Sequence, residues 1–175
     1  MHRFERWIFG ALTAALGAVS APALAVEEGD YEKKTWQEVE VGLPAAPDLS
    51  ECRDFYVSAA AKNRFCIDPR SISVGADGVV RYTLVVDTPS GSRNVTFEGM
   101  RCETRERRLY ATGQPDGTWV VSRNRQWVRI SEATANRQHA ALFLEYFCPD
   151  GIMVTKREKA LDNLRRGGYQ PKIRF

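Results

Sequence analysis

Short apolar runs alternate with turn sequences between residues 72 and 122, as expected for a series of antiparallel strands. The clearest run, residues 79–87, alternates apolar with polar side chains along much of its length. We therefore predict a strand with one packed face and one mostly solvent-exposed face. The pattern favours an antiparallel β-meander or curved sheet over a parallel sheet. Turns separate the runs at Asp77-Gly78, Pro89-Ser90-Gly91 and Pro115-Asp116-Gly117.

Helical spacing replaces this pattern after residue 131. Residues 133–147 contain no Gly or Pro and are rich in Ala and Leu. Four side chains recur at the spacing of one helix face, which predicts a helix packed against the sheet. These are His139, Leu142, Phe143 and Tyr146.

A second helix is predicted from Thr155 to about Arg166. Thr155 and Glu158 have the spacing of a capping box, and Gly167-Gly168 supplies the exit from the helix. A sheet followed by one or two C-terminal helices belongs to the α+β class.

The first 25 residues have the pattern of a secretory signal peptide. A short basic start precedes an uncharged apolar run over residues 8–20, and the segment ends in the small-x-small sequence Ala23-Leu24-Ala25. We expect cleavage after Ala25. A membrane anchor is the alternative, but a spanning helix needs about 20 apolar residues and this run is shorter. We therefore predict export without a stable membrane anchor.

Residues 26–50 begin acidic and continue through Pro44 and Pro47, which is poor material for a core. We predict an extended N-terminal arm, with Trp36, Val39 and Val41 as its points of attachment. The predicted organisation is a signal peptide over residues 1–25, the arm over 26–50, and a single α+β domain over 51–175.

All four cysteines lie in the exported part: Cys52, Cys66, Cys102 and Cys148. An even number in an oxidising compartment predicts two disulfides. Each cysteine is more than a dozen residues from the next, so no closely spaced zinc ligands are present and we predict no metal site. Spacing leaves three pairings open, of which we favour Cys52 with Cys66 and Cys102 with Cys148.

Charge argues against nucleic acid as a partner, because 25 Lys and Arg are nearly balanced by 22 Asp and Glu. Arginines do cluster around residues 101–108, but Glu103 and Glu106 lie among them. That arrangement is more typical of surface ion pairs than of an anion site.

Catalytic motifs are missing: the sequence has no nucleophile elbow, phosphate loop, zinc-protease motif or dinucleotide fingerprint. We assign no catalytic residue and no cofactor. A polar group at the start of the predicted helix is the best candidate for a ligand or anion site, if the sheet brings two arginines to it. The alternative is that this group seats the helix on the sheet. The candidate residues are Arg101, Arg105, Asn136, Arg137 and His139.

The chain resembles the cryptic neisserial protein family, a group of small exported bacterial proteins. The resemblance implies a Gram-negative periplasmic location and supplies no catalytic residues. It also implies that Cys102 and Cys148 form the core disulfide, with Cys52 and Cys66 as an additional pair. It is carried by residues 72–86, 89–91, 99–106, 116–119, 136–142 and 146–149.

We therefore expect a non-enzymatic, disulfide-stabilised binding module of the cell envelope. Its partner would be an envelope protein, a glycan or a small anionic ligand. Trp119 and Trp127 are candidates for a glycan platform, although aromatic residues in strands usually belong to the core. One alternative is an envelope hydrolase using His139 or the pair Glu103 and Glu106. The other is a self-assembling structural protein, since the sequence leaves the oligomeric state open.

Overall fold

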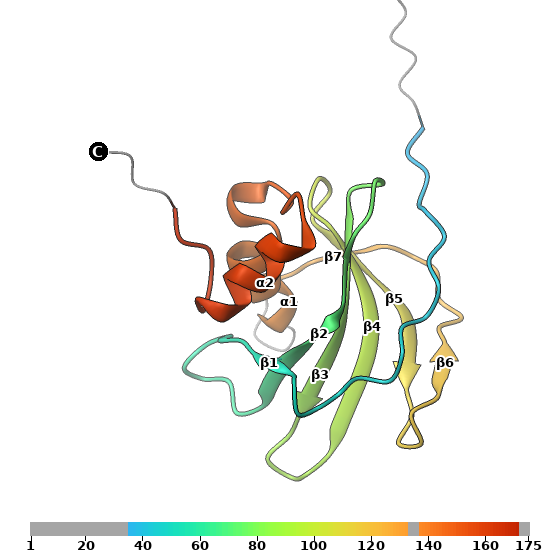
Figure 1. Cartoon of the computed structure of the whole chain (residues 1–175), viewed down its shortest axis with the longest axis vertical. Coiled ribbons are helices and arrows are strands. Elements are labelled where there is room, and N and C mark those ends of the chain that lie inside the picture. The colour runs from blue at the N-terminus through green and yellow to red at the C-terminus, as the bar shows by residue number, and fades with distance from the viewer. Residues whose placement is uncertain (1–34, 133–136, 172–175) are drawn as a thin grey trace, which may run out of the picture. The chain divides into compact units, whose positions relative to one another are not determined.

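Seven strands form one antiparallel sheet in the part of the chain that the computed structural model describes, residues 35–132 and 137–171. Neighbouring strands follow chain order from β1 to β6, and β7 pairs with β5 beyond the end of β6 (Figure 1). The strands are β1 Arg53–Asp54, β2 Arg64–Val74, β3 Val79–Asp87, β4 Arg93–Arg101, β5 Glu106–Gly113, β6 Trp119–Val121 and β7 Val128–Arg129. The predicted α+β class with an antiparallel sheet is confirmed.

Some predictions fall outside the described residues. These are the signal peptide, residues 26–34 of the arm, and residues 133–136 at the start of the first predicted helix. No helix among the described residues is both long and apolar enough to cross a membrane.

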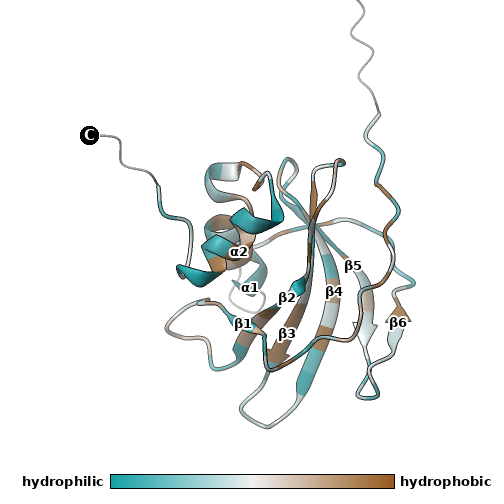
Figure 2. Cartoon of the chain, viewed as in Figure 1, coloured by the Kyte–Doolittle hydropathy of each residue, from teal (hydrophilic) through white to brown (hydrophobic). Residues whose placement is uncertain are grey.

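The helices pack on one face of the sheet. Tyr82 and Leu84 of β3 and Met100 of β4 belong to the core with helical residues such as Leu142 and Phe147. The rings of Tyr82 and Phe147 lie 5.0 Å apart. Figure 2 shows the hydrophobic residues of β2 and β3 next to the helices. The alternating positions of the strands therefore supply the helix-facing core, as the sequence predicts.

The first helix changes type along its length. It begins as α1 (Arg137–Ala141), continues as the π-helix η2 (Leu142–Phe147) and is followed by the 3-10 turn η3 (Pro149–Gly151). Within η2, Leu144 is 43% exposed, whereas Tyr146 and Phe147 are buried. The described part thus departs from the regular α-helical spacing used to predict it.

The second helix, α2 (Arg157–Arg165), begins later than predicted. Lys156 is extended at the N-cap and makes no side-chain cap hydrogen bond, so the capping box of Thr155 and Glu158 is wrong. The glycine exit is present, because Gly167 and Gly168 both have positive φ. Inside the fold, Asn163 Nδ2 donates to the backbone oxygen of Tyr146, which ties α2 to η2.

Two disulfides connect elements that are distant in the chain. Cys102 at the end of β4 bonds to Cys148 after η2, and Cys52 before β1 bonds to Cys66 in β2. These are the pairs favoured above. The bond between Cys102 and Cys148 joins the sheet to the helices. The bond between Cys52 and Cys66 attaches the segment that follows the arm to β2.

The second face of the sheet differs from the prediction. Thr83 and Arg81 of β3 were expected on a mostly solvent-exposed face, but they are 0% and 1% exposed, as buried as the opposite side. The reason is that residues 36–47 of the predicted N-terminal arm cross this face on the side away from the helices (Figure 1). From here on, the arm means residues 36–47. The sheet is therefore covered on both faces.

Candidate functional site

The arm is held on the sheet largely through its backbone. The Val39 N–H donates to the carboxylate of Asp77 (2.8 Å), and the Val39 oxygen accepts from Arg81 Nη2 (3.0 Å). Further along, the Pro44 oxygen accepts from Trp119 Nε1 (2.8 Å). The Trp36 indole N–H donates to the Asp77 backbone oxygen (2.7 Å). These contacts place the arm across β3, β5 and β6.

The aliphatic side chains of the arm contribute little to this attachment. Val39, Val41 and Leu43 are 49%, 39% and 42% exposed. Of the three predicted attachment points, Trp36 anchors the arm through its side chain and Val39 through its backbone. The arm is thus an extended chain without a hydrophobic face of its own buried in the core.

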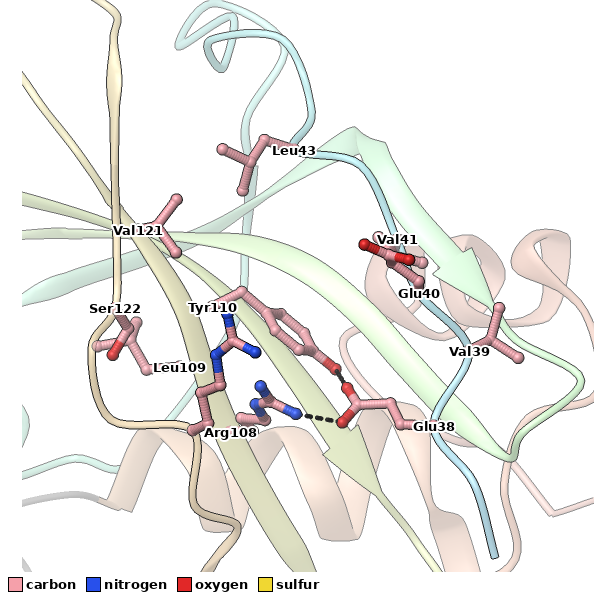
Figure 3. A pocket seen from close by; sticks show the side chains of 11 residues that line it. Glu38, Val39, Glu40, Val41, Leu43, Arg108, Leu109, Tyr110, Val121 and Ser122 are labelled. Atoms are coloured by element: carbon pink, nitrogen blue, oxygen red, sulfur yellow. Dashed lines mark hydrogen bonds and ion pairs between the residues drawn. The ribbon is translucent and has the colours of Figure 1, made fainter.

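One side chain of the arm does reach into the sheet face. The carboxylate of Glu38 accepts hydrogen bonds from Arg108 Nη1, from the Tyr110 hydroxyl and from Trp127 Nε1 (3.3 Å). Arg81 Nη2 lies 3.8 Å from it. We call Arg81, Arg108, Tyr110 and Trp127 the carboxylate cradle; Figure 3 shows Glu38 pointing toward Arg108 and Tyr110. Side chains from β3, from β5 and from the segment before β7 therefore converge on one acidic group.

A buried ion pair lies beside the cradle. Arg81 Nη2 and Asp77 Oδ2 are 2.6 Å apart, and both side chains are 1% exposed. Burial alone would raise the pKa of Asp77, but hydrogen bonds from Arg81 and from the Val39 N–H more than offset it, so the pKa lies below its ordinary value. Burial, reinforced by the Glu38 carboxylate, raises the pKa of Tyr110, which therefore stays a neutral donor.

Aromatic contacts fix the start of the arm. The guanidinium of Arg101 lies 4.1 Å from the centre of the Trp36 ring, a cation–π contact. The Trp36 and Trp127 rings meet edge to face at 5.9 Å. Trp127 therefore serves the arm in two ways, as a packing surface for Trp36 and as a donor to Glu38.

A groove of about 500 Å³ runs between the arm and strands β5 and β6 (Figure 3). Its volume falls within the range of small-molecule sites. Of the two arginines that line it, Arg108 is paired with Glu38, whereas Arg125 is exposed and has no partner among the described residues. We call this cavity the arm groove. It is lined by Glu38, Val39, Glu40, Val41, Leu43, Arg108, Leu109, Tyr110, Val121, Ser122 and Arg125.

His139 lies on the other face of the sheet, in a closed polar cluster. Its Nε2 is 2.7 Å from Glu98 Oε2, and Glu98 also accepts from the Tyr82 hydroxyl and from Thr96 Oγ1. Burial would raise the pKa of Glu98, but the charge and hydrogen bond of His139 lower it. Since His139 and Glu98 are only 5% and 3% exposed, this cluster anchors α1 to β4 rather than facing a substrate.

The remaining candidate residues are dispersed. Arg101 contacts Trp36 and Glu103 on the arm side, while Arg105 pairs with Glu132 and lies over the Phe143 ring. Arg137 is exposed at the start of α1, and Asn136 lies outside the described residues. The contacts of Arg101 are thus on the opposite side of the sheet from those of His139.

Five residues that the structure does bring together were not among the candidates predicted from the sequence: Glu38, Asp77, Arg81, Tyr110 and Arg125. One signal was available, namely an arginine in the middle of a strand that alternates with apolar residues. In the described part of the chain, no group of three or more His, Cys, Asp or Glu side chains is arranged to hold a metal ion.

Fold and site define an α+β protein whose sheet is covered by helices on one face and by an extended arm on the other. The chain belongs to the CNP1-like family, whose model matches residues 31–165. That range includes the arm and every strand and helix described. A comparison with curated proteins gave no significant match, and neither did a comparison with solved structures.

The substitution Asp77→Asn should lower the free energy of unfolding at neutral pH by about 3 kcal/mol, because it leaves the buried Arg81 charge poorly compensated. The matched control is Glu103→Gln, which removes the exposed partner of Arg101 and should cost less than about 1 kcal/mol. Urea unfolding of both variants measures the difference. An equal decrease in the free energy of unfolding of both variants would show that the buried pair stabilises the fold no more than the exposed one does.

The pH dependence of this effect has a defined sign. Because the folded-state pKa of Asp77 is lowered, its stabilisation is complete above the ordinary value of 3.8 and disappears as the pH falls through the folded-state value. The stability difference between the wild type and Asp77→Asn should therefore be constant near neutrality and shrink only in acid.

Proposed function

We propose that the protein is a non-enzymatic binding module of the bacterial cell envelope whose ligand is a small amphipathic anion. The observation that carries the proposal is the arm groove, in which aliphatic walls and a guanidinium with no partner in the described part of the chain line the same cavity. Val41, Leu43 and Val121 provide apolar contact surface, and Arg125 provides the charge. An anion with an aliphatic body matches both parts of this lining.

The other side-chain donors that line the groove are already occupied. Arg108 and Tyr110 are bound to Glu38, and the Ser122 hydroxyl donates to the Asn124 backbone oxygen. Arg125 therefore supplies the free cationic contact for a ligand, while the exposed Glu40 disfavours ligands that carry several negative charges.

The hydrolase alternative has weaker support. A general base must reach the proton that it abstracts, but His139 is buried and bonded to Glu98. Among the described residues, Glu103 faces Arg101 and Glu106 accepts from Thr104, so neither is aimed at a shared substrate position.

Export to the periplasm is supported by three features: the signal pattern of residues 1–25, the two disulfides, and the resemblance to the cryptic neisserial protein family. Disulfides persist in oxidising compartments such as the periplasm.

Protein isolated from the envelope fraction of its host should have an intact mass that begins at Val26. Without reductant it should be lighter by four hydrogens than the fully reduced chain, because two disulfides are formed. Mass spectrometry of the denatured protein measures both quantities. Retention of residues 1–25 or the presence of four free thiols would contradict the proposed compartment.

Saturated fatty acids of increasing length are suitable probes of the groove, because each buried CH₂ contributes about 0.8 kcal/mol. Isothermal titration should show affinity rising with chain length up to about ten carbons, and the matching neutral alcohols should bind more weakly. The substitution Arg125→Gln should weaken fatty-acid binding about tenfold through loss of the charged contact.

The control for this titration is Arg123→Gln, which removes an exposed arginine two residues away that does not line the groove. It should bind like the wild type. Absence of binding, or an equal loss in both variants, would contradict the assignment of the groove as the ligand site.

A further inference from the structure

We propose that the sheet face beneath the arm is a binding site for an acidic, extended segment of a partner protein, and that the arm occupies this site as an intramolecular competitor. The inference concerns the carboxylate cradle and does not depend on which small molecule enters the arm groove.

The contacts of the arm are those by which a protein recognises an extended peptide. Arg81 and Trp119 bind backbone oxygens of the arm, and Asp77 binds a backbone N–H. Such contacts are available to any extended chain, because they do not involve its side chains. The arm could therefore be replaced here by another segment with the same backbone path.

The cradle adds a requirement for an acidic side chain. Arg108, Tyr110 and Trp127 donate hydrogen bonds to the Glu38 carboxylate, Arg81 lies 3.8 Å from it, and the Glu38 side chain is only 16% exposed. An occupant without a carboxylate would leave the partly buried donors of Arg108, Tyr110 and Trp127 without their acceptor, and Arg81 with Asp77 as its only carboxylate partner. An aromatic residue two positions before the acid would gain the contacts that Arg101 and Trp127 make with Trp36. The favoured partner motif is an aromatic residue, any residue, then Glu.

Arg81 keeps one carboxylate partner when the arm leaves, because Asp77 belongs to the turn before β3. Val39, Val41 and Leu43 are already substantially exposed, so their own release uncovers little apolar surface. The sheet face beneath loses its cover, and Arg81 loses the Val39 oxygen and Glu38, so a new occupant must supply acceptors there. A turn follows the arm, in which the Asp48 carboxylate accepts from Ser50, and the disulfide from Cys52 to Cys66 then holds the chain. The turn can act as a hinge while the disulfide keeps β1 against β2.

A labelled peptide with the sequence of residues 36–47 tests the proposal on the mature protein. Glu38→Gln should weaken the attachment of the protein's own arm and bind the added peptide measurably by fluorescence anisotropy. A peptide with Gln in place of Glu38 should bind about tenfold more weakly, because it cannot pair with the cradle arginines. We call the unmodified peptide the Glu peptide and the substituted one the Gln peptide. The wild-type protein should bind the Glu peptide more weakly than the Glu38→Gln protein does, since the wild-type arm competes for the same site.

Glu51→Gln is the matched protein control, because Glu51 is an exposed acid outside the arm and the arm groove, and its carboxylate has no partner among the described residues. It should behave like the wild type. If Glu38→Gln binds neither peptide, or binds both equally, the proposal is wrong.

A second measurement covers the case in which Glu38→Gln does not fold. Excess Glu peptide added to the wild-type protein should increase hydrogen exchange in residues 36–47, because the arm is displaced, whereas the Gln peptide should not. Unchanged exchange with the Glu peptide would overturn the proposal.

Discussion

The structure depends on how one buried charge is compensated. Arg81 lies in the middle of β3 with 1% of its side chain exposed, and an ionised guanidinium can be buried only if acidic groups and acceptors surround it. Asp77 comes from the preceding turn, while Glu38 and the Val39 oxygen come from the arm. The charge in the sheet therefore makes the arm part of the fold. The same network places the arm beside β5 and β6, which creates the arm groove.

Much of the fold could be predicted from local pattern. The strand over residues 79–87, the turn at Asp77-Gly78 and the glycines that end α2 are encoded by neighbouring residues, and the structure contains all three. The start of α2 was misplaced because Lys156 is extended, and the π-helix was not foreseen because its backbone differs from the regular helical spacing. Both differences depend on packing, which local propensity does not contain.

The site was far less predictable. Polar residues at alternate positions of β3 have the same pattern whether that face meets solvent or a polar segment of the chain, so Arg81 was placed in solvent. The contact between Glu38 and Arg108 spans 70 residues, and no local signal connects them. His139 was selected as part of the polar group expected at the start of the helix, yet it is buried in the core and hydrogen-bonded to Glu98. Burial and long-range pairing, rather than residue type, decide which polar residues form the site and which support the core.

The central claim is that Glu38 attaches the arm by pairing with the cradle, and a double-mutant cycle tests it most directly. Urea unfolding of Glu38→Gln, Arg108→Gln and the double variant yields the coupling free energy of the two side chains. The account predicts a coupling of about 1–3 kcal/mol, because either single substitution removes the charged hydrogen bond between the two side chains. Effects that add to within about 0.5 kcal/mol would show that the two residues act independently and would contradict the account.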